Sequence, residues 1–307
     1  MNTPDHRPDT ATDAGRNRVA ATVSHSLQQI RRAGFAALTP GVLAALWLLT
    51  QIAYPLTSGI ARDRVTVAVV LLSAATALAH ATYTRGPRYA LGFLVIVSGI
   101  GLLAEIIGTA TGIPFGCYDY ATDRLGLAVA GVPLVVPLAW TGGMYPIWVV
   151  AGMLTERAWA RITLTAVGAV GWDLFLDPQM VADGQWHWCV TDAGLPGVEH
   201  IPLTNYLGWL IVALVMAVLL TGWEHGAPLR RGGTVVPVAV FLWTWLGSAL
   251  AHAVFLDLPA SAGYGGAGMA VLGIALLVRL IGSARAGSSG DPARPRSNDF
   301  GSSSPMS

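Results

Sequence analysis

The amino-acid sequence predicts an all-α protein, a polytopic bundle of about eight transmembrane helices whose two termini both lie in the cytoplasm. Composition is the first observation behind this prediction. Of the 307 residues, 53% are hydrophobic and 11% are charged, whereas soluble domains average about 25% charged residues. The spacing of the apolar stretches and the placement of the arginines are the second and third observations. Together they predict a multi-pass protein of the cell membrane that contacts membrane lipid.

Eight stretches are apolar enough to be membrane spans, since a spanning helix needs about 20 mainly apolar residues. We expect spans near residues 33–56, 64–84, 89–112, 132–154, 158–176, 203–222, 234–256 and 266–282. The fifth and eighth of these stretches are short. The polar N-terminal stretch 1–32 and the Gly/Ser/Pro-rich stretch 283–307 are expected to be disordered cytoplasmic tails on either side of one transmembrane domain, residues 33–282.

The arginines support an even number of spans, because cytoplasmic segments of membrane proteins carry an excess of basic residues. With a cytoplasmic N-terminus, 15 of the 18 basic residues fall inside, and only Arg62, Arg64 and Arg124 fall outside. The net charge is +1 and no basic face is formed, so nucleic acid is not expected as a partner. The chain contains no lysine, which excludes lysine-imine chemistry.

The third expected span carries one carboxylate, Glu105. Gly101, Gly108, Thr109 and Gly112 share its helical face at spacings of three and four. Ionisable groups inside spans are costly and are usually functional, so a substrate-facing acid is one interpretation. A close helix contact through small residues, with Glu105 hydrogen-bonded across it, is the other.

The fifth expected span carries two carboxylates, Asp173 and Asp177, four residues apart on one helical face. Like charges so placed disfavour joint ionisation, so one of the two can stay protonated at neutral pH. Because Pro178 follows Asp177, this residue can also be a helix end wetted at the membrane interface. Asp173 lies deeper in the span and is the better candidate for a functional acid.

These polar residues are expected at one level of the membrane. Spans three, five and seven run outward in the predicted topology, which places Glu105, Asp173 and His252 in the outer third. Asn205 begins the sixth span at the same level. A lone histidine in a helix is more often a hydrogen-bonded packing residue than a functional group, so both interpretations of His252 stay open.

Two long outer loops, about residues 113–131 and 177–202, are rich in aromatic and acidic side chains and can cover a pocket at this level. Aromatic residues also collect at membrane interfaces in general, which is an alternative explanation of the tryptophans. Cys117 and Cys189 lie in these two loops, so a disulfide between them is possible in an oxidising exterior. Two free thiols are equally ordinary.

Four motifs in order carry a family resemblance. They are AEIIGTATGIPFGCYDY, GVPLVVPLAW, GWDLFLDPQM with a downstream WHW, and IPLTNYLGW. Together they resemble the membrane family of carotenoid biosynthesis proteins that includes the CruF-type carotenoid hydratases, over roughly residues 35–282. Members of that family add water across the terminal double bond of an acyclic carotenoid end group and give a tertiary alcohol. The resemblance therefore implies a carotenoid hydratase, with a carotenoid as substrate and other carotenoid-pathway membrane enzymes as further partners.

The polar and aromatic positions that match these motifs are Glu105, Thr111, Tyr118, Trp140, Asp173, Asp177, Trp188, Asn205 and Trp209. Protonating an unactivated alkene needs a buried carboxylic acid, so Glu105, Asp173 and Asp177 are the expected catalytic residues. Trp140 and Tyr118 can stabilise the resulting cation through their ring faces. No metal or cofactor is required. The expected substrate-binding residues are Tyr118, Trp140, Trp188, Asn205, Trp209 and His252, the last of which lies outside the shared motifs.

Two other functions stay open on the sequence. The spacing of Asp173 and Asp177 is of the kind that holds magnesium diphosphate in membrane prenyltransferases, although the expected pocket lies on the arginine-poor side. Intramembrane carboxylates also serve proton relays, so a transporter or a carotenoid-binding membrane protein is the non-enzymatic alternative. The paired broken helices expected of many transporters are not visible in the sequence.

Overall fold

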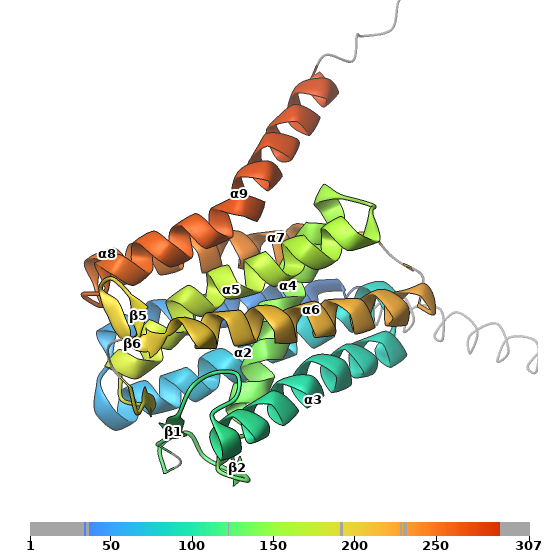
Figure 1. Ribbon diagram of the computed structural model, residues 1–307. Coiled ribbons are helices and arrows are strands. Elements are labelled where there is room, and N and C mark those ends of the chain that lie inside the picture. Colours follow the sequence, from blue (N-terminus) through green and yellow to red (C-terminus); the bar gives the residue numbers. More distant parts are fainter. Residues whose placement is uncertain are drawn as a thin grey trace, which may run out of the picture.

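The computed structural model describes residue 34 and residues 37–121, 123–190, 193–227, 229 and 232–288. Long helices lie side by side in one bundle (Figure 1). In chain order they are Ala37–Leu56, whose last turn is the 3-10 segment Tyr54–Leu56, then α2 (Gly59–Arg85), α3 (Pro87–Thr111), α4 (Val135–Leu154), α5 (Ala158–Ala182), α6 (Leu203–His225), α7 (Val235–Leu242), the π-helical turn Trp243–Gly247, α8 (Ser248–Val254) and α9 (Pro259–Ser288). The tails expected at residues 1–32 and 283–307 lie outside the described residues, except that α9 extends to Ser288.

Within the described residues, seven helices are long and apolar enough to cross a membrane, which confirms a multi-pass membrane protein. They correspond to all the expected spans but the fifth, and α7, the π-helical turn and α8 together form the seventh. The fifth is α5, which contains Arg161, Asp173 and Asp177 and is therefore less apolar. It contacts α4, α6, α8 and α9, so its polar face lies within the bundle. The side of the membrane on which each terminus lies stays a prediction.

The expectation that the fifth span is short is wrong, because α5 continues through Asp177 and Pro178 to Ala182. A proline in a helix cannot bond the carbonyl four residues earlier, which here belongs to Leu174. The hydroxyl of Ser261 on α9 donates to that carbonyl oxygen at 2.7 Å. Membrane helices tolerate proline when a neighbour satisfies the freed backbone group in this way. Asp177 is consequently a buried residue inside the helix and not a wetted helix end.

We expect Ser261→Ala to destabilise the protein by about 1–3 kcal/mol, because the substitution leaves a buried carbonyl of α5 without its donor. Thermal unfolding of the purified protein in detergent measures this effect as a lowered midpoint. The matched control is Ser283→Ala on the same helix, since Ser283 is exposed and donates only to Arg279 of its own helix. Equal midpoints for the two variants would show that the Ser261 hydroxyl does not support the helix through Pro178.

The expectation that the eighth span is short is also wrong. Helix α9 begins at Pro259, a residue favoured in the first turn of helices, and includes a glycine-rich stretch at residues 263–268. These glycines are helical because α9 packs closely on α5. A Cβ added to Gly171 of α5 would lie 2.7 Å from the backbone carbon of Gly268, so the two backbones are in direct contact.

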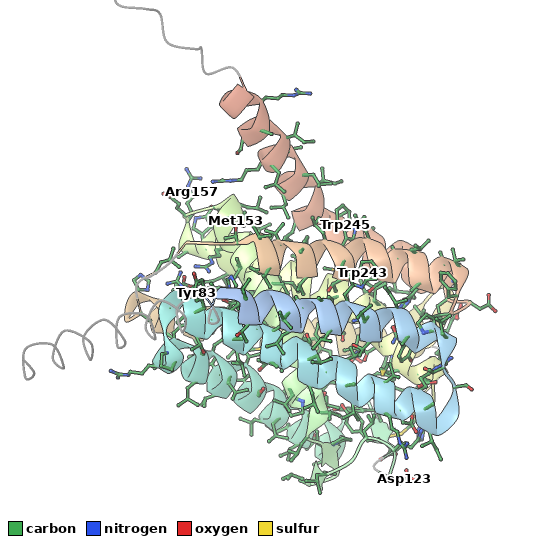
Figure 2. The ribbon with its side chains drawn as sticks, turned by 180° about the vertical axis from the view of Figure 1, so that it is seen from behind. Tyr83, Asp123, Met153, Arg157, Trp243 and Trp245 are labelled. Carbon is green, nitrogen blue, oxygen red and sulfur yellow. A yellow bond between two sulfur atoms is a disulfide. The ribbon has the colours of Figure 1, made fainter. Side chains whose placement is uncertain are left out.

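The loops at one end of the bundle form three short two-stranded sheets. The strands are β1 (Tyr118–Tyr120), β2 (Ala128–Val129), β3 (Val132–Pro133), β4 (Trp186–Trp188), β5 (Gly194–Leu195) and β6 (Val198–Pro202). Strands β1 and β4 pair antiparallel, with Tyr118 opposite Trp188, and so join the two long loops expected to cover a pocket. Figure 2 shows Asp123 at this end and Tyr83 and Arg157 at the opposite end. We call the end with Asp123 the loop end.

Candidate active site

Three carboxylates converge in one cavity near the loop end. Glu105 comes from α3, and Asp173 and Asp177 come from α5; their residues are 3%, 1% and 4% exposed, and all three line the same cavity. The cavity encloses about 1210 Å³ of empty space, its open mouth included. The structure thus brings together Glu105 and Asp173, which were predicted to lie at one level of the membrane, and adds Asp177 to them.

Glu105 is held by an aromatic residue of the outer loop. The hydroxyl of Tyr118 on β1 donates to Oε2 of Glu105 at 2.5 Å. Gly108 makes this approach possible, since a Cβ at that position would lie 2.7 Å from the Tyr118 hydroxyl and 2.5 Å from Cδ2 of Phe115. The small-residue face of α3 therefore accommodates loop side chains at this level.

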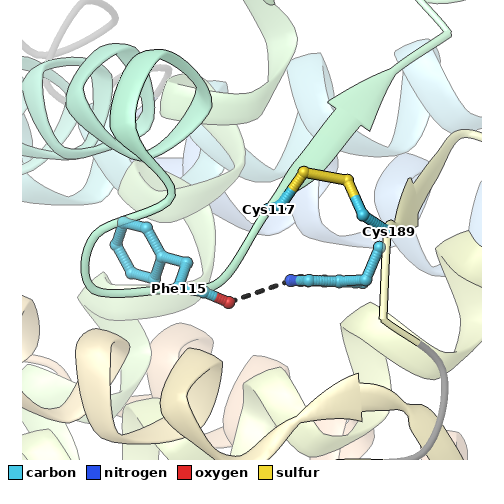
Figure 3. The surroundings of a disulfide bond; sticks show 4 residues. Phe115, Cys117 and Cys189 are labelled. Atoms are coloured by element: carbon cyan, nitrogen blue, oxygen red, sulfur yellow. Dashed lines mark hydrogen bonds between the residues drawn. A yellow bond between two sulfur atoms is a disulfide. The ribbon is translucent and has the colours of Figure 1, made fainter.

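Phe115 fixes the loop that carries Tyr118. Its buried ring lies between α3 and α6, where a Cβ on either Gly108 or Gly208 would clash with it. The indole nitrogen of Trp188 donates to the carbonyl oxygen of Phe115 at 2.9 Å (Figure 3). Trp188 also stacks on the Tyr118 ring, with ring centroids 5.5 Å apart. Three contacts therefore set the position from which Tyr118 reaches Glu105.

The two cysteines form a disulfide, which settles the alternative left open by the sequence. Cys117 is the residue before β1 and Cys189 is the residue after β4, so the disulfide lies next to Tyr118 and Trp188 (Figure 3). The backbone N–H of Cys189 also donates to the carbonyl of Cys117 at 2.8 Å. The two loops are thus linked covalently and by hydrogen bonds next to Tyr118 and Trp188, which line the cavity.

The phenols of β1 lie outside the membrane spans. Burial raises the pKa of both Tyr118 and Tyr120 above the usual value, and the neighbouring charge of Glu105 raises each pKa further. Both phenols therefore keep their protons, and the Tyr118 hydroxyl can donate its hydrogen bond to Glu105 over the whole physiological pH range.

The aspartates of α5 differ from each other in their partners. The side-chain amide of Asn205, at the start of α6, donates to Oδ2 of Asp177. Oδ2 of Asp173 is buried and has no hydrogen-bond partner among the described residues. The hydroxyl of Tyr206, on the next residue of α6, is likewise buried without a partner among those residues. The missing partner concerns Oδ2 alone, since the Asp173 carboxyl group also interacts with the neighbouring Asp177 side chain.

Tryptophan rings form the wall beside the carboxylates. Trp140 of α4 stacks on Trp209 of α6 at a centroid distance of 4.2 Å. Trp140 also packs edge to face against Trp172 of α5 at a centroid distance of 5.2 Å. All three residues line the cavity, as do Tyr118 and Trp188. Of the predicted substrate-binding residues, all but His252 line the cavity.

His252 lies behind the lining and does not face the cavity. It is fully buried, with Nδ1 2.8 Å from the Ser261 hydroxyl and Nε2 3.1 Å from Oε1 of Gln179. Its ring packs edge to face on Phe175. Gln179 and Phe175 both line the cavity, so His252 contacts the site through these two residues. These contacts fit the interpretation of His252 as a hydrogen-bonded packing residue, and they give no direct contact with a substrate.

Several lining residues were not named from the sequence as site residues. They are Gln51 and Tyr54 of the first span, Tyr120 of β1, Trp172 and Gln179 of α5, and Trp186 of β4. Gln51 carried a usable signal, because it is an uncharged polar residue within an otherwise apolar stretch. Within the described ranges, no group of three or more His, Cys, Asp or Glu side chains is arranged to hold a metal ion.

An ion-pair network lies at the loop end and engages two of the three arginines predicted to lie outside. Arg124 contacts Asp63 at 2.6 Å and Arg62 contacts Asp183 at 3.1 Å. Gln185 donates to Oδ1 of Asp63 at 2.7 Å, so α2 is tied to the loops after β1 and before β4. Arg62 also lies over the ring of the lining residue Tyr54. A structural role therefore accounts for Arg62 and Arg124 on the arginine-poor side.

Comparison with known proteins agrees with the resemblance seen in the motifs. Residues 65–272 match the model of the family described as carotenoid biosynthesis protein. A bisanhydrobacterioruberin hydratase of Haloarcula japonica is 28% identical over 131 residues, which is 41% of this chain and 43% of that protein's length. No solved structure matches the chain. Because the family match covers more than half of the residues, the chain belongs to the carotenoid biosynthesis protein family.

Proposed function

We propose that the protein is a carotenoid hydratase that adds water across the terminal double bond of an acyclic end group. The observation that carries the proposal is the unengaged carboxyl oxygen of Asp173 in a cavity walled by tryptophans. An acid with a free proton and ring faces without polar groups suit the protonation of a hydrocarbon. The named activity of the Haloarcula japonica relative supports the same reaction class.

Asp173 is the proposed proton donor. Its proton forms the new C–H bond on the less substituted alkene carbon, which consumes the π bond and leaves a tertiary cation on the other carbon. A water molecule adds its oxygen lone pair to the cation and loses one proton to Asp177. Asp177 lies one helical turn from Asp173, so this proton returns to Asp173 and restores the acid. The sum is the addition of one water molecule to one double bond.

Glu105 and the rings stabilise the cation in this scheme. The Glu105 carboxyl, held by the Tyr118 hydroxyl, lies in the same cavity as the cation and opposes its charge when it is ionised. Trp140 lines this cavity with Trp209 stacked on it, and aromatic rings attract cations by about 2 kcal/mol when water is excluded. The protein thus supplies an acid on α5 and a second carboxyl group, held by a loop residue, on α3.

Isotope labelling tests the proposed reaction. Membranes from a host that accumulates an acyclic carotenoid and expresses this chain are incubated in ¹⁸O-labelled water. We expect a tertiary alcohol that carries one ¹⁸O atom per hydrated end, and no such product without the chain. Unchanged pigment would contradict hydratase activity. Magnesium-dependent turnover of a prenyl diphosphate would instead support the prenyltransferase alternative.

Replacing Trp140 tests the role of the ring wall. We expect Trp140→Leu to lower the hydration rate about 30-fold, which corresponds to about 2 kcal/mol of lost cation stabilisation. The measurement is the initial rate of alcohol formation per amount of folded protein. Trp159→Leu is the matched control, because Trp159 lies on α5 with 67% of its surface exposed and outside the cavity lining. A Trp140 variant as active as this control would remove the ring from the mechanism.

We also propose that the loop end faces the oxidising exterior of the cell. The disulfide of Cys117 and Cys189 lies at this end, and disulfides persist in oxidising compartments. Treating intact cells with a membrane-impermeant phosphine reductant should expose both thiols to an impermeant maleimide. Labelling that requires permeabilised cells would place the loop end in the cytoplasm and overturn this orientation.

A further inference from the structure

Four uncharged polar side chains line the cavity without a hydrogen-bond partner among the described residues. Gln51 comes from the first span, Ser73 from α2, Thr244 from the π-helical turn and Ser248 from α8. They come from helices other than α3 and α5, which carry the carboxylates. Thr244 and Ser248 lie four residues apart along one continuous helix, and Gln51 and Ser73 line the same cavity from the first span and α2. We call this set of four side chains the hydroxyl face.

The lack of partners on the hydroxyl face is unusual for membrane helices. Hydroxyls within a helix ordinarily donate to the carbonyl of the preceding turn, as Thr66, Thr165 and Thr221 do at 2.7–2.9 Å. Thr244 makes no such bond although it is only 9% exposed. It lies in the π-helical turn Trp243–Gly247, and such turns occur frequently at functional sites. The polar atoms of the hydroxyl face thus line the cavity without an intramolecular hydrogen bond and are available to a ligand there.

The chemistry of these side chains defines that ligand. Two serines, a threonine and a glutamine supply both donors and acceptors but no charge. They suit a small neutral O–H group and not an ion. Two sources of such a group exist in the proposed reaction: water, which is consumed, and a hydroxyl already present on the carotenoid.

We infer that the hydroxyl face is the site that holds the water consumed in hydration, an inference that depends on the proposed function. The reaction removes one water molecule per turnover inside a membrane bundle, where apolar walls surround the cation. Proton transfer from Asp173 makes the C–H bond, and water from the hydroxyl face supplies the C–O bond. The proton that this water loses goes to Asp177, as in the scheme above.

The fate of the cation provides a readout specific for water supply. A cation that is not captured by water loses a proton from a neighbouring carbon to the carboxylate and re-forms an alkene. In D₂O the donor carries deuterium, so this return leaves deuterium in recovered hydrocarbon. The ratio of alcohol to deuterated hydrocarbon therefore reports capture by water separately from the formation of the cation.

The decisive variant is Thr244→Val, which replaces a hydroxyl by a methyl group of similar size. We expect the ratio of alcohol to deuterated hydrocarbon to fall at least roughly tenfold in membranes incubated with an acyclic carotenoid in D₂O. Thr221→Val is the matched control, since Thr221 lies on α6, donates to Ala217 and does not line the cavity. Ser248→Ala serves as a second variant if Thr244→Val does not fold.

Each outcome of this experiment has a distinct meaning. A general structural defect would lower both products together and leave their ratio unchanged, and an unchanged ratio in both variants overturns the water site. A ratio that falls only for carotenoids that already carry a hydroxyl would assign the hydroxyl face to the substrate and not to water. If the unmodified chain forms neither alcohol nor deuterated hydrocarbon, the proposed function itself fails.

Discussion

Asp173→Asn is expected to abolish alcohol formation, with a loss of about 10²- to 10⁴-fold, the usual contribution of a general acid. The amide has nearly the shape of the carboxylic acid, so packing in the interior of α5 is preserved while the transferable proton is lost. Pigment extracted from a carotenoid-producing host measures the effect as accumulation of the unhydrated precursor. Deuterium exchange into recovered hydrocarbon should vanish as well, because no cation forms.

Asp119→Asn is the control for this experiment. Asp119 lies on β1 at the same end of the bundle, is exposed and does not line the cavity, so the same chemical change there should leave the pigment unaltered. If Asp173→Asn still makes alcohol while Asp177→Asn or Glu105→Gln does not, the proton donor is one of these other acids. Activity in all three variants would contradict carboxylic-acid catalysis in this cavity.

Gly108→Ala is expected to lower activity through the loop that holds Glu105. The added methyl group would lie 2.5 Å from Phe115 and 2.7 Å from the Tyr118 hydroxyl, closer than real side-chain contacts. Overpacking of this kind costs about 1–3 kcal/mol. Either Phe115 leaves its place between α3 and α6 or Tyr118 withdraws from Glu105. We expect the hydration rate to fall roughly tenfold or more in either case.

Gly99→Ala separates this steric effect from a general effect on the helix. Both residues lie on α3, but nothing lies within 4 Å of a Cβ added to Gly99. The two variants gain the same helix propensity, so they should differ only in the loop contact. Comparing alcohol formation and the thermal midpoint in detergent measures this difference. Equal rates in the two variants would show that the Tyr118 contact with Glu105 is not needed for activity.

The membrane fold was largely predictable because lipid leaves few alternatives to apolar helices. Hydropathy located the spans, and the cost of burying carboxylates made Glu105 and Asp173 stand out. The course of α5 through Pro178 was not predictable, since the donor that satisfies its freed carbonyl belongs to Ser261, 87 residues further along the chain. Local sequence contains no information about a partner so distant.

The candidate site was predictable in its acids and less so in their surroundings. The motifs contained Tyr118 and Trp209, but the aromatic wall depends on which rings meet across helices. Gln51 and Thr244 escaped attention because a single uncharged polar residue in a span is ordinarily satisfied by its own helix. His252 lies behind Gln179 and not in the cavity lining, because the rotation of its helix turns the side chain away from the cavity. The spacing of residues along the chain does not determine that rotation.

The disulfide also constrains the order in which this protein can be made. Cys117 and Cys189 are 72 residues apart, and the segment between them contains both α4 and α5. The bond therefore closes a covalent ring of which both helices are part. The thiols of Cys117 and Cys189 can be oxidised to a disulfide only after both helices and the loop that follows them have been inserted. Synthesis under reducing conditions would yield an inserted bundle in which the loops that carry β1 and β4 are not joined by the disulfide.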